Sequence, residues 1–478
     1  MTTTTTCSRR FAMARSQVSL AALLTGLIAA SCVPAPRPVG TAEPPLPTGH
    51  PSEPVEQAPL PAPTPAPPAV PADAPQRFEL REEPTIDVGM AWDLDSLVVD
   101  PVETGGSSFQ RAGKAPDGLS TGYVGALVIS RGAEGFLFEF RQRRGQTPLV
   151  PGDTLWTTRT PDRVRPGDRI RWNSRTWRGT FKIFVNPRGK LTIAARLPLE
   201  TYLNGVVPGE IGALDEHLIE AGRAQAVAAR SYTMFYRGRR AAEGFDLYGT
   251  VEDQVFGPIE SERAVATRCV ESTRGTLALA GGFPIRANYY STCGGITADV
   301  WEAWPAPPLS YLVSHTDAGD SLDWCANSPQ YRWRERWSVT EFMSNLARFG
   351  PQQGIALPPG GVGEFVDVIA EARSRSGRVW RLRVLTTTGD IVIPAYSIRQ
   401  VLRRGGNPTA ILRSNLFKID VRRDPGSRRA LEVLASGAGS GHGVGLCQTG
   451  ALSMANSGRS AAEILEQYYR GAVVKKLY

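Results

Sequence analysis

The chain has 478 residues, with 54 Lys and Arg against 46 Asp and Glu, and a formal net charge of +8. Its basic residues are spread along the chain, without a Cys/His finger spacing or a long basic helix, which argues against nucleic acid as a partner. Beyond residue 76 no apolar run is long enough to cross a bilayer, and about 400 residues suffice for a sizeable core with more than one lobe.

Residues 1–32 have the pattern of a targeting segment. A basic start with Arg9, Arg10 and Arg15 precedes an apolar run, Val18–Ala30, which is right for a signal peptide and too short to span a bilayer. Without these three arginines the net charge is 8 − 3 = +5. Small residues before Cys32 resemble a bacterial lipoprotein cleavage box, so we expect lipid attachment at Cys32; the alternative is cleavage and release.

Residues 33–76 contain 16 prolines in 44 residues and no aromatic residue. Such a composition cannot build a core and predicts an extended linker. It is either a spacer for a tethered protein or a tail without a role. We therefore expect three parts: the targeting segment 1–32, the linker 33–76 and a folded region 77–478.

The first part of the folded region is predicted to be rich in strands, because it has short runs of β-branched and aromatic residues. The predicted strands are Thr85–Ala91, Gly125–Ser130, Gly135–Phe140, Arg178–Val185 and Lys190–Ala195, with a hairpin turn at Asn186–Gly189. Gly118–Gly122 fits the G-x-S-x-G pattern of a hydrolase nucleophile elbow, but a polar segment stands before it where that elbow needs a strand.

Glu210 has an unusual setting for a carboxylate. It follows Pro208 and Gly209, between Val207 and Ile211. Pro and Gly favour a turn, so the sequence predicts Glu210 at a bend rather than within a regular element. Apolar surroundings raise the pKa of a carboxyl group, which makes a Glu a proton donor near neutral pH. The alternative is a surface Glu between two helices.

A long helix is predicted after this bend, from an N-cap at Asp215 to the basic residues Arg237–Arg240. Many of its residues are small, so another backbone can approach it closely. We expect Gln225, Arg230 and Tyr232 to bind substrate. Arg230 is either a solvated charge or holds a carboxylate, in a substrate or near Glu210.

Further along, short strands are predicted over Gly275–Ala280 and Ile285–Tyr290, and helices over Ser261–Ser272 and Ala461–Tyr469. Two glycine-containing loops are candidate binding segments, because glycine lets a ligand approach the backbone. We expect these loops to line one cleft with Glu210. Their candidate substrate-binding residues are Ser291, Thr292, Gly294, Gly295, Thr297, His442, Gly443 and Gln448.

Together these segments resemble the stage II sporulation protein D (SpoIID) and LytB amidase-enhancer family of bacterial wall proteins. The similarity extends from about Thr85 to the C-terminus, and its motifs occur in the same order. The motifs are LPLETYLNGVVPGEI, QAVAARSY at Gln225–Tyr232, DQVFG at Asp253–Gly257, YYSTCGGITADVW at Tyr289–Trp301, IRQVL, LRSNLF at Leu412–Phe417, GHGVGLCQTGA from Gly441 and AAEILEQYYRGA from Ala461.

The resemblance implies a lytic transglycosylase that cleaves peptidoglycan strands stripped of stem peptides and leaves 1,6-anhydro ends. Glu210 matches the family's catalytic Glu, which acts as acid and then as base. The rivals are Glu200, in an expected short helix, and Glu220, on a helix surface. The expected fold is α+β, with a β-rich N-terminal part, a central helix and a loop-rich catalytic lobe, in two lobes around a cleft. The protein is then exported to the cell envelope, with glycan strands, a lipid-anchored membrane and a cell-wall amidase as partners.

Two other classes remain open: a non-catalytic glycan-binding enhancer of an amidase, and a hydrolase that uses Cys293 or Cys447 with His442. Some relatives bind zinc, but Tyr290 stands where many have His and the sequence offers no clustered ligand set, so we expect no metal and no cofactor. An oxidising compartment favours a Cys293–Cys325 disulfide, although Cys269, Cys293, Cys325 and Cys447 allow three full pairings.

Overall fold

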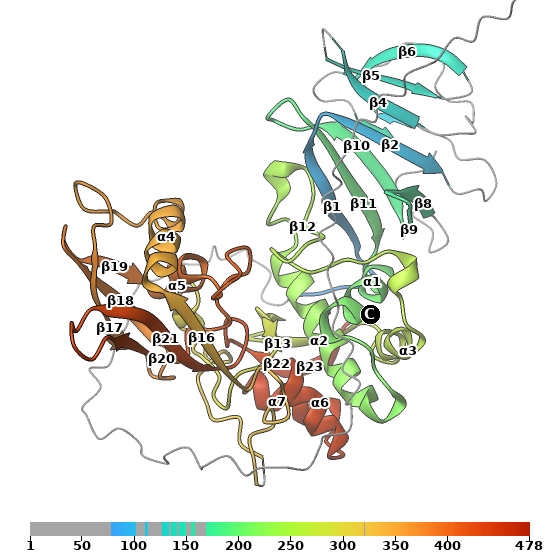
Figure 1. The fold of residues 1–478 in the computed structure, drawn as a ribbon. Helices are drawn as coiled ribbons and strands as arrows, with labels where there is room; N and C mark the ends of the chain where they lie inside the picture. The colour runs from blue at the N-terminus through green and yellow to red at the C-terminus, as the bar shows by residue number, and fades with distance from the viewer. Residues whose placement is uncertain are drawn as a thin grey trace, which may run out of the picture. The chain divides into compact units, whose positions relative to one another are not determined.

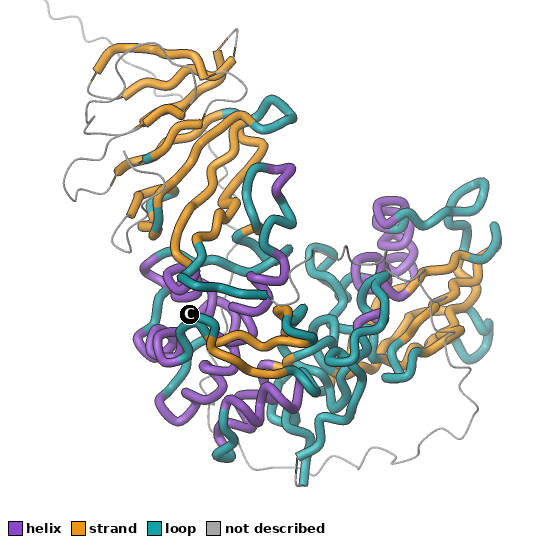
Figure 2. The backbone as a smooth tube through the Cα atoms, turned by 180° about the vertical axis from the view of Figure 1, so that it is seen from behind, coloured by secondary structure: helices purple, strands orange, loops and turns teal. Residues whose placement is uncertain are grey.

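The computed structural model describes residues 78–101, 110–112, 127–132, 135–140, 143–149, 154–157, 169–319 and 321–478. The targeting segment, the linker and the Gly118–Gly122 motif lie outside this range. The described chain contains helices and several sheets, so the predicted α+β class is confirmed. Figure 2 shows the strands gathered into sheets, with helices grouped beside them.

The first sheet of the described chain has the strand order β12-β1-β11-β10-β7-β3, and only the β1–β12 pair among these is parallel. The Asn186–Gly189 turn joins β10 to β11 as predicted: the Asn186 N–H donates to the Lys190 carbonyl (2.8 Å), and Gly189 has φ +70°. The strands are β1 (Thr85–Leu94), β3 (Gln110–Ala112), β7 (Thr154–Trp156), β10 (Thr180–Val185), β11 (Leu191–Pro198) and β12 (Leu247–Tyr248).

A second, antiparallel sheet has the order β6-β5-β4-β2-β8-β9 within the described ranges. The predicted strand Arg178–Val185 is divided between the two sheets at Gly179, whose φ of +106° breaks the extended backbone. The strands are β2 (Ser96–Pro101), β4 (Leu127–Gly132), β5 (Gly135–Phe140), β6 (Arg143–Leu149), β8 (Arg169–Trp172) and β9 (Arg175–Arg178).

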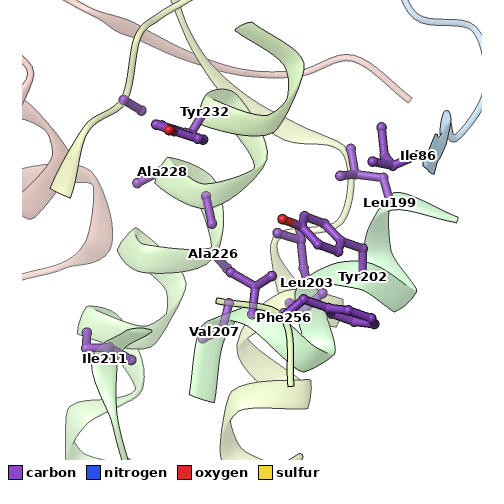
Figure 3. Close-up of a cluster of buried hydrophobic side chains, with 14 of the residues drawn as sticks. Ile86, Leu199, Tyr202, Leu203, Val207, Ile211, Ala226, Ala228, Tyr232 and Phe256 are labelled. Atoms are coloured by element: carbon purple, nitrogen blue, oxygen red, sulfur yellow. The ribbon is translucent and has the colours of Figure 1, made fainter. Parts of the chain in front are cut away.

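The long helix α2 (Ile219–Tyr236) lies among α1 (Leu199–Ile211), α3 (Ala264–Ser272), α6 (Gln448–Asn456) and α7 (Ala461–Tyr468) and contacts all four (Figure 1). Its small residues allow the close approach that the sequence predicts: a Cβ at Gly222 would lie 2.5 Å from the Cys269 sulfur of α3. Figure 3 shows Leu203 and Val207 of α1 filling the space beside Ala226 of α2. These helices and the first two sheets share one hydrophobic core.

Two small sheets join distant segments to this core. The first contains β13 (Thr276–Ala280), β14 (Phe283–Pro284) and β23 (Val473–Lys476), and the second pairs β15 (Tyr289–Tyr290) in parallel with β22 (Leu446–Cys447). The predicted strand Ile285–Tyr290 is therefore shorter than expected. Among the described helices, none has the length and apolarity needed to cross a membrane.

A second hydrophobic core is formed by the segment between residues 333 and 435, around the fully buried Trp337 and Phe342. The chain then returns to the first core at Val444. The elements of the second core form two three-stranded sheets and two helices: β16 (Arg332–Ser338), β17 (Phe365–Arg373), β18 (Val379–Thr386), β19 (Ile391–Pro394), β20 (Phe417–Arg423), β21 (Ala430–Ala438), α4 (Val339–Phe349) and α5 (Ala395–Leu402).

Short 3-10 turns complete the described structure: Glu216–Leu218, Ala241–Glu243, Ile259–Ser261, Val300–Glu302 and Pro351–Gln353. Asp215 stands at the N-cap position of the first of them, without a capping hydrogen bond from its side chain, and α2 follows directly at Ile219. The predicted start of the long helix is therefore about one turn too early.

Candidate active site

Glu210 lies in the last turn of α1, so the prediction of a bend is wrong. Pro208 is inside the helix, where a proline costs about 3 kcal/mol. The flanking Val206, Val207 and Ile211 are buried, and each such side chain stabilises the fold by about 1.5–3 kcal/mol. Core packing therefore outweighs the local turn preference. The helix ends immediately afterwards at Gly212, where φ is +83°.

The loop that follows β12 approaches α1 closely because Gly205 has no side chain. The Gly257 N–H donates to the Gly205 carbonyl (3.0 Å), and a Cβ at Gly205 would lie 2.6 Å from the Phe256 ring. This approach brings the Val255 N–H to 2.9 Å from Glu210 Oε1. The backbone of the loop thus holds the carboxyl in place.

The Glu210 carboxyl is suited to proton transfer. Burial raises the pKa of the Glu210 carboxyl to about 7, although hydrogen bonds from the Val255 N–H and the Tyr289 side chain favour the charged form. The residue as a whole is only partly buried, although protein atoms surround most of its carboxyl group. The predicted raised pKa is therefore confirmed, and its cause is burial.

A buried glutamine organises the groups behind this carboxyl. Gln254 accepts a hydrogen bond from the Tyr289 hydroxyl (2.9 Å) and donates to the Tyr202 hydroxyl (3.1 Å) and the Thr233 hydroxyl (2.7 Å). Sequence reasoning did not include Gln254, Tyr202 or Tyr289 among the site residues. The signal was present in the DQVFG motif, which contains Gln254 and Val255.

Arg230 has a different role from the one expected. It is fully buried, and its Nε and Nη2 donate to the two carboxylate oxygens of Glu200 at 2.9 and 2.6 Å. Burial opposes the charge of Glu200, but the hydrogen bonds and charge of Arg230 hold the pKa of this carboxyl below its usual value. Arg230 thus binds a carboxylate of the protein core, and the prediction that it contacts substrate is wrong. The same pairing excludes Glu200 as a free acid.

Tyr232, Gln225 and Gln448 lie along one side of α2. The Tyr232 ring is 6.2 Å from the Tyr289 ring, and Gln448 Nε2 donates to Gln225 Oε1 at 3.4 Å. Gln225 is fully buried, and its amide nitrogen has no partner among the described residues. The structure therefore brings these three predicted residues together, with Gln448 the most accessible of them.

The hydroxyl residues of the Ser291–Thr297 loop differ in accessibility. Ser291 is exposed, whereas Thr292 is buried and its hydroxyl lies 2.8 Å from Ser328 and 3.1 Å from Thr449. Thr297 is also buried, and its Oγ1 accepts a hydrogen bond from the His315 N–H (2.9 Å). Ser291 alone of these three remains free to contact a ligand directly.

The predicted glycines are needed for packing within the chain. A Cβ at Gly294 would lie within 2.8 Å of Ala438, one at Gly295 would meet the Asp323 carboxylate, and one at Gly443 would meet the Arg378 guanidinium. All three have positive φ, which favours glycine. The close approach expected for a ligand is thus made by the protein itself.

His442 connects the second glycine-containing loop to β15. Its Nδ1 accepts a hydrogen bond from the Val444 N–H (3.1 Å), and the ring also bonds to the backbone of Tyr289. The ring packs against Tyr290 (5.1 Å) and Trp304 (4.7 Å). Burial and nearby arginines lower the pKa of His442 to about 3, which keeps the imidazole neutral. Tyr289 thus contacts both His442 and, through its phenol, Glu210.

Three cysteines and one aspartate meet behind β15 and β22. The ligand-type atoms of Cys293, Asp317, Cys325 and Cys447 lie within 4.8 Å of one another, and all four residues are fully buried. The expectation that the chain offers no clustered ligand set is therefore wrong. The sulfurs of Cys293 and Cys325 are 3.2 Å apart, with both cysteines as free thiols, so their disulfide stays a prediction. Cys269 lies apart, in α3.

Comparison with known proteins agrees with the motifs. The family described as "Stage II sporulation protein" (SpoIID) matches residues 187–279, and a "Domain of unknown function (DUF8618)" matches residues 320–445, which contain most of the second core. An uncharacterized protein of Brachyspira hyodysenteriae is 28% identical over 290 residues, which cover 60% of this chain and 70% of that protein.

Two relatives come from Bacillus subtilis. Its stage II sporulation protein D is 25% identical over 304 residues, 59% of this chain and 75% of that protein. Its amidase enhancer is 26% identical over 297 residues, 57% of this chain but 40% of that protein. These matches define the chain as a protein with a cell-wall related role. More particularly, residues 187–279 match the SpoIID family model, and the chain is similar to members of the SpoIID/LytB family.

Proposed function

We propose that the protein is a lytic transglycosylase that cleaves the glycan strands of peptidoglycan, with Glu210 as its catalytic residue. The observation that carries this proposal is the setting of Glu210: a partly buried residue whose carboxyl pKa is raised to about 7 by burial. Such a group can be protonated before bond cleavage and ionised after it, at a pH near neutrality.

In the proposed reaction, Glu210 first donates its proton to the glycosidic oxygen, and the bond from that oxygen to the anomeric carbon breaks. The 6-hydroxyl of the same muramyl residue forms the new bond to the anomeric carbon, and the Glu210 carboxylate accepts the hydroxyl proton. The products are a 1,6-anhydro end and a free hydroxyl end, no water is consumed, and Glu210 is protonated again.

A single carboxyl suffices for this chemistry, whereas ordinary glycosidases need two. The nearby sequence offers Asp253, but its side chain is fully buried and pairs with Arg239 and Arg240 at 3.2 Å each. The carboxylate of Asp253 also accepts the Tyr248 N–H (2.9 Å). These contacts assign Asp253 to the structure of the loop and leave Glu210 to act alone.

Two neighbours of Glu210 serve the proposed reaction as positioning residues. The Val255 N–H fixes one carboxylate oxygen, and the Tyr289 phenol, itself oriented by Gln254, supports the charged form. Both stabilise the carboxylate at the moment when it must accept a proton. They also offset part of the effect of burial, which keeps the pKa near 7 rather than higher.

Aromatic side chains gather near Tyr289, a neighbour of Glu210. The ring centroids of Tyr232 and Tyr236 are 4.6 Å apart, with the rings tilted by 55°, and Arg286 lies 5.8 Å from the Tyr236 ring and 4.4 Å from the Trp304 ring. We assign Tyr232, Ser291 and Gln448 to substrate binding: Ser291 and Gln448 are accessible polar groups that suit the hydroxyls of a glycan, whereas Tyr232 is largely buried and contributes through the aromatic cluster. Thr292, Gly294, Gly295, Thr297, His442 and Gly443 would act through the shape of the loops, and Gln225, in α2, through its hydrogen bond with Gln448.

A non-catalytic enhancer of a cell-wall amidase is the second candidate function, and the relative named amidase enhancer supports it. The match covers 40% of that relative, so this similarity concerns only part of it. A Cys/His hydrolase is disfavoured, because Cys293 and Cys447 are fully buried and His442 contacts neither. We further propose export to the cell envelope with a lipid anchor at Cys32, and a cell-wall amidase as partner.

Mass spectrometry of digested, peptide-free glycan separates these functions. We expect new anhydro-muramyl ends when the full chain is incubated with such strands. New reducing ends would identify a hydrolase. Unchanged ends, with the protein retained on the strands in a pull-down, would identify a binding protein and contradict the proposed activity.

A further inference from the structure

The cysteine cluster (Cys293, Asp317, Cys325 and Cys447) gathers residues that lie far apart in the sequence. Cys293 follows β15, Asp317 and Cys325 come from a loop, and Cys447 belongs to β22. Cys293 Sγ lies 3.2 Å from Cys325 Sγ and 3.0 Å from Asp317 Oδ2. The protein therefore places three sulfurs and one carboxylate oxygen around a single point in its interior.

These two separations are shorter than those around a bound tetrahedral ion by roughly half an ångström, so zinc would need only a small outward shift of the side chains. Zn–S bonds of about 2.3 Å put two sulfurs about 3.8 Å apart in a tetrahedron, and Zn–O bonds of about 2.0 Å put oxygen about 3.5 Å from sulfur. In the cluster every ligand-type atom lies within 4.8 Å of the others. Three thiolates and a carboxylate form a complete four-ligand set for zinc, with no position left for water.

Backbone N–H groups around the cluster are directed at the sulfurs. Cys293 N donates to Cys447 Sγ (3.2 Å), Gly295 N to Cys293 Sγ (3.3 Å) and Gly450 N to Cys447 Sγ (3.4 Å). Such donors stabilise the negative charge of a thiolate, as hydrogen bonds to the ligands of a metal ion commonly do. A neutral thiol would gain much less from them.

The carboxylate is oriented in the same way. The Tyr468 hydroxyl donates to Asp317 Oδ1 (2.8 Å), which leaves Oδ2 facing Cys293 Sγ. The approach of Tyr468 and Asp317 requires Gly450, because a Cβ there would lie 1.9 Å from the Tyr468 hydroxyl and 3.0 Å from Asp317 Oδ2. Each oxygen of Asp317 is thus held in a defined direction.

We propose that Cys293, Asp317, Cys325 and Cys447 bind one structural Zn²⁺ ion in a closed tetrahedral site. Tyr290 is not part of this site: its ring packs against His442, so the absence of a histidine at that position does not remove the site. Because the site is closed, its role is to fasten segments rather than to activate water.

The proposed zinc ion would hold the wall of the candidate active site. Cys447 is paired with Tyr290 in the β15–β22 sheet, and the neighbouring Tyr289 contacts Glu210. Cys293, three residues after Tyr290, supplies a second ligand from the same wall. This consequence rests on the proposed function, whereas the binding of zinc does not.

A Cys293–Cys325 disulfide is the alternative use of these residues, and the two arrangements exclude each other. A disulfide removes two of the three thiolates and leaves one sulfur and one carboxylate, too few for a stable zinc site. The state of the cysteines in the full-length protein therefore decides between them.

The test is the zinc content of the purified full chain, measured by elemental mass spectrometry after dialysis without chelator. We expect one zinc per chain, its loss in Cys325→Ser and its retention in Cys269→Ser, which removes a cysteine outside the cluster. In case Cys325→Ser fails to fold, the native protein loaded with Co²⁺ provides a second readout, with thiolate-to-cobalt charge-transfer bands expected.

Alkylation of the denatured native protein without reductant completes the test. We expect free Cys293, Cys325 and Cys447 once zinc is removed. A Cys293–Cys325 linked peptide, a metal-free protein, or the same zinc content in Cys325→Ser as in the native chain would each overturn the proposal. None of these results depends on transglycosylase activity, so the site and the proposed function can fail separately.

Discussion

Replacing Arg230 with Met should destabilise the protein strongly and in a pH-dependent way. Met keeps the length of the side chain but leaves the buried Glu200 carboxylate without its main partner. Removing one member of a buried ion pair costs about 3–5 kcal/mol. Glu200 keeps hydrogen bonds from the Gly275 N–H (3.1 Å) and the Tyr478 hydroxyl (2.6 Å), so we expect a loss near the lower end of this range.

The pH dependence follows from the ionisation of Glu200. In the native protein the pKa of Glu200 is lower than in the unfolded chain. The ionised Glu200 therefore stabilises the fold at a pH above its unfolded pKa, and this stabilisation is lost as the pH falls through its pKa in the folded protein. In Arg230→Met the carboxyl would be neutral. Protonating a group with an unfolded pKa of about 4.3 costs about 3.7 kcal/mol at pH 7 but about 1 kcal/mol at pH 5. The defect should therefore shrink on acidification.

Urea unfolding followed by circular dichroism at both pH values measures this defect. Arg223→Met is the matched control, because Arg223 lies on the same helix and pairs with Glu220 at the surface, with side chains 35% and 30% exposed. We expect that control to lose only about 0.2–0.5 kcal/mol. Equal losses in the two variants, or an Arg230→Met defect that does not change with pH, would refute this reasoning.

Three further predictions concern the active site, the fold and the anchor. Because cleavage needs protonated Glu210, kcat/KM should fall about tenfold per pH unit above about pH 7. Tyr289→Phe should move this fall to higher pH, because the hydrogen bond that it removes favours the Glu210 carboxylate. A pH–rate profile that is the same in the variant would contradict the role of Tyr289. Gly205→Ala should lower the free energy of unfolding by about 1–3 kcal/mol, because the Cβ of the alanine would overlap the Phe256 ring. Urea unfolding at the same denaturant concentration as the native protein would show that the loop with Phe256 can move away. Cys32→Ser should release the protein from envelope membranes, and equal membrane retention on fractionation would rule out the lipid anchor.

Local patterns in the sequence predicted the elements that local chemistry determines. The Asn186–Gly189 hairpin, the long helix after Asp215 and the C-terminal helix are found because turn residues, caps and periodic apolar faces act over a few residues. The local turn preference of Pro208 and Gly209 predicted a bend, but the burial of their neighbours, a tertiary effect, keeps them helical.

Contacts between distant segments could not be predicted in this way. Arg230 meets Glu200 across 30 residues, and the Cys293 N–H meets the Cys447 sulfur across 154. Nothing in the spacing of these residues indicates their pairing, because it depends on how α1, α2, β15 and β22 pack. The second core was also missed, although Trp333 and Trp337 of β16, four residues apart, lie on the same buried face of that strand.

The candidate catalytic residue was predictable, whereas its supporting groups were not. An apolar neighbourhood around Glu210 is visible in the sequence and correctly indicated a raised pKa. The contribution of Tyr289 and Gln254 depends on a loop that approaches α1 at Gly205, a contact that becomes visible only in three dimensions.

Glu210→Gln tests the central claim most directly. Gln keeps the shape of the side chain but has no acidic proton, so the release of anhydro-muramyl products from peptide-free glycan should fall by about 100- to 10,000-fold. Glu216→Gln, at an exposed carboxyl just before α2, is the control and should retain its activity. Pull-down on the same strands should show that both variants still bind glycan. Anhydro-product release by Glu210→Gln at the rate of the unchanged protein would contradict the account.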